Sequence, residues 1–132
     1  MDKYKSKLIF NKYIIKEIEF KYHEEFKEKP IDILFDIDKE TKYIANKNMI
    51  VDLDVRIFED NEKYPFYMKV VLRGFFTIEN NEDNINFEPN AIAILYPYIR
   101  SIVSTYTANA NIMPLTLPVI NVNKLLKDKE KD

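Results

Sequence analysis

Hydrophobic and polar residues alternate with a period of two over much of the first two thirds of the chain. The clearest case runs from Met49 to Ile57, where every second residue is apolar and those between are mostly charged. Because successive side chains of a β-strand point to opposite faces, this alternation predicts a strand with one buried face. The same pattern predicts further strands over about residues 11–22, 31–37 and 66–78.

Segments rich in turn-forming residues separate these strands, at residues 38–48, 59–63 and 79–86. Consecutive strands with short connections and no helical pattern between them predict an antiparallel meander. Gly74 is the only glycine and interrupts the last strand, with the apolar face switching after it. We interpret it as a β-bulge, where glycine accommodates unusual backbone angles.

The apolar spacing changes to that of an α-helix after Pro89, and Asn90 is a suitable N-cap residue. Pro97 lies inside this segment and predicts a kink, because proline removes one backbone hydrogen bond. The apolar arc of the helix spans about 200°, roughly twice what one sheet contact requires. The extra width predicts a second contact, most simply with another subunit. The recurring apolar residues are Ile92, Leu95, Ile99, Ile102, Val103 and Tyr106.

The end of the chain is irregular before it becomes helical again. Residues 109–123 are apolar and bracketed by prolines, and an apolar loop normally has to be covered by something. Leu125 and Leu126 then indicate a short helix that leads into a charged tail, residues 127–132. We see no internal repeat, so residues 1–132 are predicted to form a single α+β domain that includes a basic N-terminal arm at residues 1–10.

The amino-acid composition favours a protein that binds other molecules over an enzyme. The 132 residues include nine Tyr and nine Phe, but one His, one Gly and no Cys. These counts exclude a disulfide framework, a thiolate nucleophile, a Cys-ligated zinc site and a glycine-rich phosphate loop. A small-ligand or enzymatic domain would need a polar pair of perturbed acidity in a pocket, and the sequence offers none. We therefore predict no enzyme activity and no cofactor.

Charge and hydropathy limit the classes of partner. The net charge is −2 with both signs interspersed, and lysines outnumber arginines 17 to 3, so we predict no nucleic-acid binding. The apolar stretches are too short to span a bilayer or to form the core of a signal peptide, which predicts a cytoplasmic protein without membrane insertion. The apolar residues exceed what a chain of this size buries alone. They predict an oligomer, an apolar groove for a partner, or both.

Three polar features admit a functional interpretation, but we favour a structural one for each. Four aspartates on adjacent strands have the chemistry of a Ca²⁺ site, yet no loop carbonyls accompany them, so a solvated face is favoured. His23 is interpreted as an exposed or capping residue rather than a general base or pH sensor. The lysines before residue 8 resemble a mobile terminus more than a nucleic-acid contact. The aspartates are Asp36, Asp38, Asp52 and Asp54.

Two motifs resemble those of a known family. The segments Ile94–Arg100 and Pro114–Asn121 resemble the long helix and the following loop of the SecB protein-export chaperones. That family reads roughly I-L-F-P-Y-A-R in the helix and P-x-L-N-L-A-P-V-N-F in the loop. Phe35–Asp38 resembles the family's L-D-L-D strand, and the strand that contains Gly74 resembles its fourth strand. The likeness covers about residues 11–126.

The resemblance implies a four-stranded antiparallel sheet with a long helix packed on it and a short C-terminal helix. SecB-like subunits assemble as a homotetramer, a dimer of dimers, which would account for the wide apolar arc of the helix. Six residues match by position those that organise the tetramer. They are Met68, Val70 and Leu72 on the last strand, and Ile99, Ile102 and Tyr106 on the helix.

The implied function is that of an ATP-independent holdase, which binds unfolded polypeptide clients in apolar grooves and keeps preproteins competent for secretion. Apolar and aromatic contacts suit this role because they tolerate many sequences, and extended clients can add backbone pairing. Each residue that matches the family's groove also fits a position in the core. These residues are Ile33, Phe35, Ile37, Ile112, Leu115 and Leu117, with Leu125 and Leu126 on the covering helix.

The chain departs from the family at the face that docks the export ATPase. Glu17 keeps one acidic position of that face, but Lys21 and Lys69 stand where acids are expected. Charge reversal at a docking face lowers association rate and specificity, so we expect this chain to dock the export ATPase weakly. The alternative is a dedicated SecB-like chaperone or adaptor for a single partner, such as the antitoxin of a toxin–antitoxin system.

Overall fold

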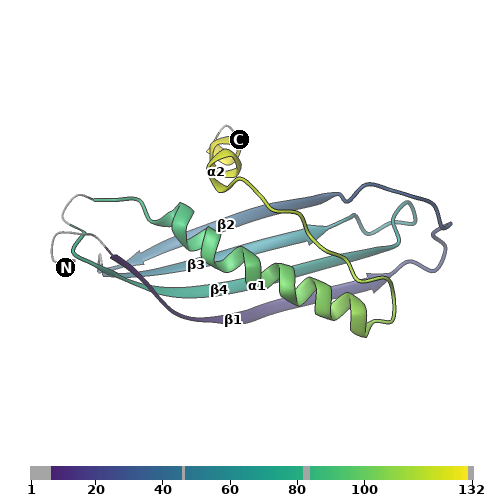
Figure 1. The fold of residues 1–132 in the computed structure, drawn as a ribbon, viewed down its shortest axis with the longest axis horizontal. Helices are drawn as coiled ribbons and strands as arrows, with labels where there is room; N and C mark the ends of the chain where they lie inside the picture. The colour runs from purple at the N-terminus through teal and green to yellow at the C-terminus, as the bar shows by residue number, and fades with distance from the viewer. Residues whose placement is uncertain (1–6, 46, 82–83, 131–132) are drawn as a thin grey trace.

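Four antiparallel strands form one sheet in the computed structural model, which describes residues 7–45, 47–81 and 84–130. The strands are β1 (Lys7–Tyr22), β2 (Phe35–Ile44), β3 (Asn48–Ile57) and β4 (Phe66–Glu79). The long helix α1 (Glu88–Asn109) lies along one face of the sheet, and the short helix α2 (Val122–Glu130) lies beyond the β2 edge (Figure 1). The α+β fold expected from the sequence is confirmed.

The strand order is β1-β4-β3-β2, so the expected meander holds only for β2, β3 and β4. β1 pairs with β4 instead of β2. The connection between Tyr22 and Phe35 therefore passes the end of the sheet over three strand spacings of about 4.8 Å each, which an extended segment of this length spans easily. This Greek-key order leaves β1 and β2 as the two edges of the sheet.

Several boundaries differ from those predicted. β2 begins at Phe35 rather than at about residue 31. β1 begins at Lys7, so residues 7–10 belong to the sheet rather than to a basic arm, while residues 1–6 lie outside the described residues. β2 runs on to Ile44, because the polar residues that suggested a turn are paired with α1. Lys39 Nζ, for example, donates to Glu88 Oε1 at 3.0 Å. The predicted charged tail is helical up to Glu130.

β4 is regular through Gly74, which contradicts the predicted bulge. Gly74 pairs in register with Val51 on β3, and buried residues alternate with half-buried ones without a break over residues 66–78. The apolar face therefore does not switch. The register shifts lie on β1 instead, around Asn11 and Lys16.

The start of α1 also differs from the prediction. The N-cap position is occupied by Phe87, and Asn90 lies inside the first turn. The side chain of Asn86 accepts a hydrogen bond from the N–H of Glu88 at 3.0 Å and so satisfies one of the free donors of the helix start. The helix continues through Pro97 to its end at Asn109.

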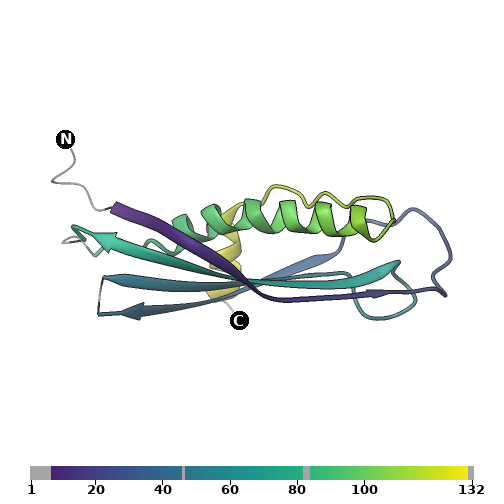
Figure 2. The ribbon, with the colours of Figure 1, turned by 90° about the horizontal axis from the view of Figure 1, so that it is seen from below.

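The hydrophobic core fills the space between α1 and the sheet face beneath it (Figure 2). Aromatic rings meet at both ends of this layer. Tyr13 of β1 lies 4.7 Å from Tyr98 of α1 between ring centroids, and Phe20 of β1 lies 5.4 Å from Tyr106. The opposite face of the sheet, here called the outer face, is covered by neither helix (Figure 2).

Candidate functional site

An apolar groove lies at one end of the molecule, between the end of β1, the connection that follows it and the segment after α1. Its volume is about 510 Å³. Ile33 is 40% exposed and Met113 is 88% exposed, so the groove presents apolar surface to solvent. Among the lining residues Glu28 alone carries a charge. The lining residues are Tyr22, Phe26, Glu28, Ile31, Ile33, Phe58, Pro65, Phe66, Ile112, Met113, Pro114 and Leu115.

One wall of the groove continues into an extended segment, residues 112–121, that α1 holds through side chains. The hydroxyl of Tyr96 donates to the carbonyl of Pro118 at 2.6 Å. One turn later, Arg100 Nε donates to the carbonyl of Leu117 at 2.9 Å. These bonds satisfy backbone groups that no neighbouring strand reaches.

The next turns of α1 hold Leu115 by both of its backbone groups. Ser104 Oγ donates to the Leu115 carbonyl at 3.0 Å, and the Leu115 N–H donates to Thr107 Oγ1 at 2.9 Å. Thr107 is completely buried and donates in turn to the carbonyl of Val103. Tyr96, Arg100, Ser104 and Thr107 share one helix face because they are spaced by three or four residues. Polar residues at this spacing, within an otherwise apolar helix face, were a sequence signal that the helix binds the backbone of a following segment. The prediction from sequence did not use that signal.

The structure brings together only some of the residues predicted to bind clients. Ile33, Ile112 and Leu115 line the groove. Three others are buried within the chain and present almost no surface to a ligand: Ile37, Leu117 and Leu126. Phe35 and Leu125 are partly buried against the core. The prediction missed Tyr22, at the end of a predicted strand, and also Phe26 and Met113, whose only sequence signal was an apolar side chain in a segment without periodicity.

Four of the residues expected at a subunit interface belong to the core of the single chain. Met68, Val70, Leu72 and Ile99 are 0% exposed, because β4 and α1 pack face to face. They therefore leave no area for a partner in this structure. Ile102 is partly buried, and Tyr106 remains 37% exposed. Further exposed apolar side chains lie nearby on β1 and α1, namely Ile14, Ile15 and Tyr98.

The three residues predicted to dock the export ATPase lie on the outer face, and their charges are paired. Lys69 Nζ lies 3.5 Å from Glu17 Oε1, across the β1–β4 pair. Lys21 Nζ donates to Asp60 Oδ2 at 2.8 Å, and this contact raises the pKa of Lys21. The outer face thus presents mixed charge at this place rather than the acidic surface that the resemblance implied.

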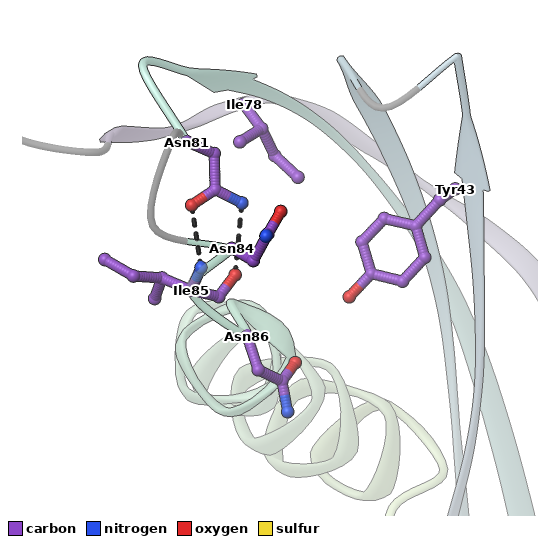
Figure 3. Close-up of a pocket in the computed structure, with 6 residues that line it drawn as sticks. All are labelled: Tyr43, Ile78, Asn81, Asn84, Ile85 and Asn86. Carbon is purple, nitrogen blue, oxygen red and sulfur yellow. Dashed lines mark hydrogen bonds between the residues drawn. The ribbon is translucent and has the colours of Figure 1, made fainter.

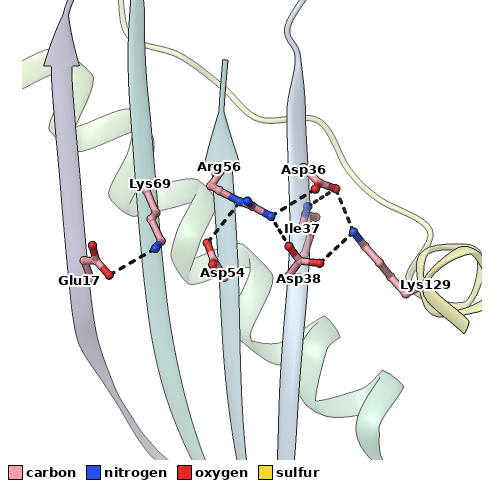
Figure 4. A network of polar contacts seen from close by, with 8 residues as sticks. All are labelled: Glu17, Asp36, Ile37, Asp38, Asp54, Arg56, Lys69 and Lys129. Atoms are coloured by element: carbon pink, nitrogen blue, oxygen red, sulfur yellow. Dashed lines mark hydrogen bonds and ion pairs between the residues drawn. The ribbon is translucent and has the colours of Figure 1, made fainter. Parts of the chain in front are cut away.

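A row of ion pairs continues across the outer face to α2 (Figure 4). Arg56 of β3 binds the carboxylates of Asp36 and Asp38 on β2, and Lys129 of α2 binds the same carboxylates at 3.1 and 3.0 Å. Burial opposes ionisation of Asp36, but the hydrogen bond and charge of Lys129 lower its pKa. These aspartates bind cationic side chains. Among the described residues, no three His, Asp or Glu side chains lie close enough together to hold a metal ion.

His23, interpreted from the sequence as an exposed or capping residue, is largely buried. Its side chain is 9% exposed and connects the end of β1 to the loop between β3 and β4. Nδ1 lies 2.8 Å from the carbonyl of Tyr64, and Nε2 lies 2.8 Å from Asp60 Oδ1. Asp60 accepts from both Lys21 and His23, which lowers the pKa of its carboxyl group. This cluster fixes one end of the groove.

A polar depression of about 470 Å³ lies at the other end of the molecule (Figure 3). Asn81 closes its loop by accepting from the N–H of Ile85 at 2.8 Å and donating to the carbonyl of the same residue. Across the depression, burial and the charge of Glu88 raise the pKa of Tyr43. The described residues that line it are Tyr43, Ile78, Asn81, Asn84, Ile85 and Asn86, none of which carries a carboxylate, imidazole or amine.

Comparison with known proteins shows which family of proteins this groove and fold belong to. A family model described as preprotein translocase subunit SecB matches residues 3–132. The chain belongs to the SecB family. Family membership gives it a chaperone function, as the sequence motifs had indicated. Among the described residues, no helix is long and apolar enough to cross a membrane.

Similar proteins come from archaea and bacteria. Protein MJ0357 of Methanocaldococcus jannaschii, itself uncharacterized, is 39% identical over 96% of this SecB-family chain and 87% of its own length. The protein-export protein SecB 2 of Francisella tularensis subsp. novicida is 29% identical over 73% of the chain and 68% of its own length. Among solved structures, the SecB-like chaperone Rv1957 of Mycobacterium tuberculosis, in complex with a peptide from the antitoxin HigA1, has a TM-score of 0.61. It is 21% identical and the match covers 86% of this chain and 90% of Rv1957.

Proposed function

We propose that this SecB-family chain is an ATP-independent holdase that binds unfolded polypeptides in the groove beside residues 112–115. The observation that carries the proposal is an exposed apolar groove whose wall is attached to α1 by backbone hydrogen bonds. A fixed wall presents apolar side chains without refolding, so little ordering free energy is lost on binding. No step requires a nucleotide or a catalytic group, and the proposed role is not enzymatic.

The proposal is tested by the aggregation of an unrelated unfolded protein, measured by light scattering without nucleotide. The native chain should suppress aggregation at a stoichiometric ratio. Met113→Asp should weaken suppression several-fold, because Met113 lines the groove and is 88% exposed. Val119→Asp is the matched control: it is 81% exposed on the same segment but does not line the groove. Equal behaviour of the two variants would contradict the proposed site.

The second candidate is a dedicated chaperone for one partner. It is favoured by the structural neighbour Rv1957, which holds a peptide from an antitoxin. Lys21 and Lys69 fit the same candidate, because positive charge on the outer face is expected to weaken docking of an export ATPase. Purification of the chain from its own cell distinguishes the two: many precursors support the general holdase, and one stoichiometric protein supports the dedicated chaperone.

We further propose that the chain works in the cytoplasm as a homotetramer, a dimer of dimers. Ile14 and Ile15 on the β1 edge and Tyr98 on α1 are between 39% and 47% exposed and offer an apolar surface for it. Sedimentation equilibrium should give a mass near 63 kDa, four times the 15.8 kDa of one chain. A mass of 15.8 kDa at micromolar concentration would contradict the tetramer.

A further inference from the structure

One methionine of the groove wall is exposed to solvent, whereas the described methionines of the core are not. Met113 is 88% exposed and lines the groove. Met49 on β3 and Met68 on β4 are each 0% exposed, because both belong to the core. Met1 lies outside the described residues. Among the described methionines, an oxidant dissolved in water therefore reaches the side chain of Met113 first.

The backbone on both sides of Met113 is attached to α1. The N–H of Ile112 donates to the carbonyl of Thr107 at 3.4 Å. Two residues after Met113, the N–H and the carbonyl of Leu115 bind side chains of α1 at 2.9 and 3.0 Å. None of these bonds uses the side chain of Met113. A change in the chemistry of that side chain therefore leaves the path of the backbone in place.

The surface that surrounds Met113 is apolar. Ile112 and Leu115 line the same groove, and Glu28 alone carries a charge among the described residues that line it. The thioether of methionine suits such a surface, because it is polarisable and its flexible side chain adapts to many shapes. Methionine sulfoxide is polar instead. Burying it against an apolar ligand costs free energy unless the ligand supplies a hydrogen-bond donor.

We propose that Met113 is a reversible oxidation site, at which a hydroperoxide weakens the binding of clients to the groove. The inference rests on the proposed holdase function and adds a regulation of the same groove. With hydrogen peroxide, the sulfur lone pair forms an S–O bond, the O–O bond breaks, and the other oxygen leaves as water with both protons. The sulfur loses two electrons to the peroxide. A methionine sulfoxide reductase reverses the step with two thiols, which become a disulfide while the oxygen leaves as water.

The positions of the methionines separate this regulation from oxidative damage. A sulfoxide at Met49 or Met68 would place a polar oxygen in the close-packed core and destabilise the fold. Both side chains are 0% exposed, so the folded chain protects them. Oxidation at Met113 changes only the surface of the groove. Mild treatment with peroxide should therefore lower the affinity for clients and leave the free energy of unfolding unchanged.

The test compares the native chain with Met113→Leu, whose apolar side chain is not oxidised by peroxide. Both are treated with hydrogen peroxide, the peroxide is removed, and each is compared with its own untreated sample in the light-scattering assay. Mass spectrometry of the native chain should show oxygen added to Met113 about tenfold faster than to Met49 or Met68. Treatment should weaken suppression of aggregation several-fold for the native chain and not for Met113→Leu. Both chains keep Met1, Met49 and Met68, so oxidation there cannot explain the difference.

A second measurement uses only the native chain and stands even if Met113→Leu alters the fold. A methionine sulfoxide reductase supplied with dithiothreitol should restore suppression, and the urea midpoint should be the same before and after oxidation. Full suppression with Met113 oxidised, or an equal loss in treated Met113→Leu, would overturn the proposal. A lowered urea midpoint would also overturn it, because unfolding would then explain the loss. An untreated native chain that fails to suppress aggregation would instead contradict the holdase proposal.

Discussion

Gly74 lies directly against Leu95 of α1: a Cβ atom built on Gly74 would stand 2.7 Å from Leu95 Cδ2. The same atom would stand 2.8 Å from Cε1 of Phe76. Both distances are shorter than a carbon–carbon contact allows. The glycine is therefore explained by the close approach of α1 to β4, and not by an unusual backbone angle.

Gly74→Ala should destabilise the chain by about 1–3 kcal/mol, because an added methyl group overpacks this contact. Urea unfolding followed by circular dichroism measures the change. Leu95→Ala removes two of the three close contacts and leaves only that with Phe76, so Gly74→Ala should cost less in the Leu95→Ala background. An equal cost in both backgrounds would show that the contact with Leu95 is not the cause.

Thr107→Val should loosen the segment that forms the groove wall. The substitution preserves shape but removes the oxygen that accepts from the Leu115 N–H, and an unpaired buried donor costs about 1–3 kcal/mol. Amide hydrogen exchange at Leu115 should accelerate, and unfolding should occur at lower urea concentration. Thr105→Val is the control, because Thr105 is exposed on the same helix. Equal exchange rates at Leu115 in the two variants would contradict the attachment.

Lys129→Ala should release the end of α2 from the sheet. Lys129 binds Asp36 and Asp38, and this pairing raises its pKa. Partly exposed pairs contribute only about 0.2–1 kcal/mol, so global stability should change little while amide exchange in α2 accelerates. High salt should reproduce the effect in the native chain. Lys127→Ala is the control, since Lys127 is exposed and has no ion-pair partner among the described residues. The same acceleration in both variants would rule out the ion pairs as the cause.

The spacing of apolar residues correctly predicted the strand and the helix that bury one face against the core. The alternation of Met49 to Ile57 and the helical spacing after Pro89 both reflect side chains that meet the core, and both elements are present. β2 was predicted too short because Lys39 and Thr41 face α1 yet are polar, and their partner Glu88 is distant in the sequence. A period of two in hydrophobicity is lost wherever such a pair replaces an apolar contact.

The groove was predicted only in part, because it depends on which segments meet. Ile33 and Leu115 were identified by resemblance, whereas Tyr22 and Phe26 enter the groove because β1 lies beside β4 at the edge of the sheet. Strand order is a non-local property that alternation does not encode. The same limitation assigned Met68 and its neighbours on β4 to a subunit interface, although α1 of the same chain covers them.

Two aspartates lie on the same face of β3, and removing the charge of each should have different effects on the free energy of unfolding. Arg73 donates to both carboxylate oxygens of Asp52, at 2.7 and 2.8 Å, and this bond lowers the pKa of Asp52. Burial raises the pKa of Asp54, despite the charges of Lys69 and Arg56. Asp52 thus stabilises the fold above its unfolded-state pKa of about 3.9, and this contribution is lost as pH falls through its folded-state pKa. For Asp54 the sign is reversed: its contribution is present below the unfolded-state pKa and is lost as pH rises through the folded-state pKa.

Asp52→Asn should therefore lower the free energy of unfolding at pH 7, by up to about 1 kcal/mol for a pair that keeps some exposure to solvent. Asp54→Asn should leave it unchanged or raise it, because the amide avoids burying a charge. Urea titrations at pH 7 and pH 3 measure both variants against the native chain. Both differences should shrink at pH 3, because the unfolded chain binds protons at both carboxyl groups there and the charge of Asp52 then stabilises the folded state less. Each variant serves as the control for the other, since they lie two residues apart on one strand. A loss of stability at pH 7 as large for Asp54→Asn as for Asp52→Asn would show that burial does not dominate at Asp54.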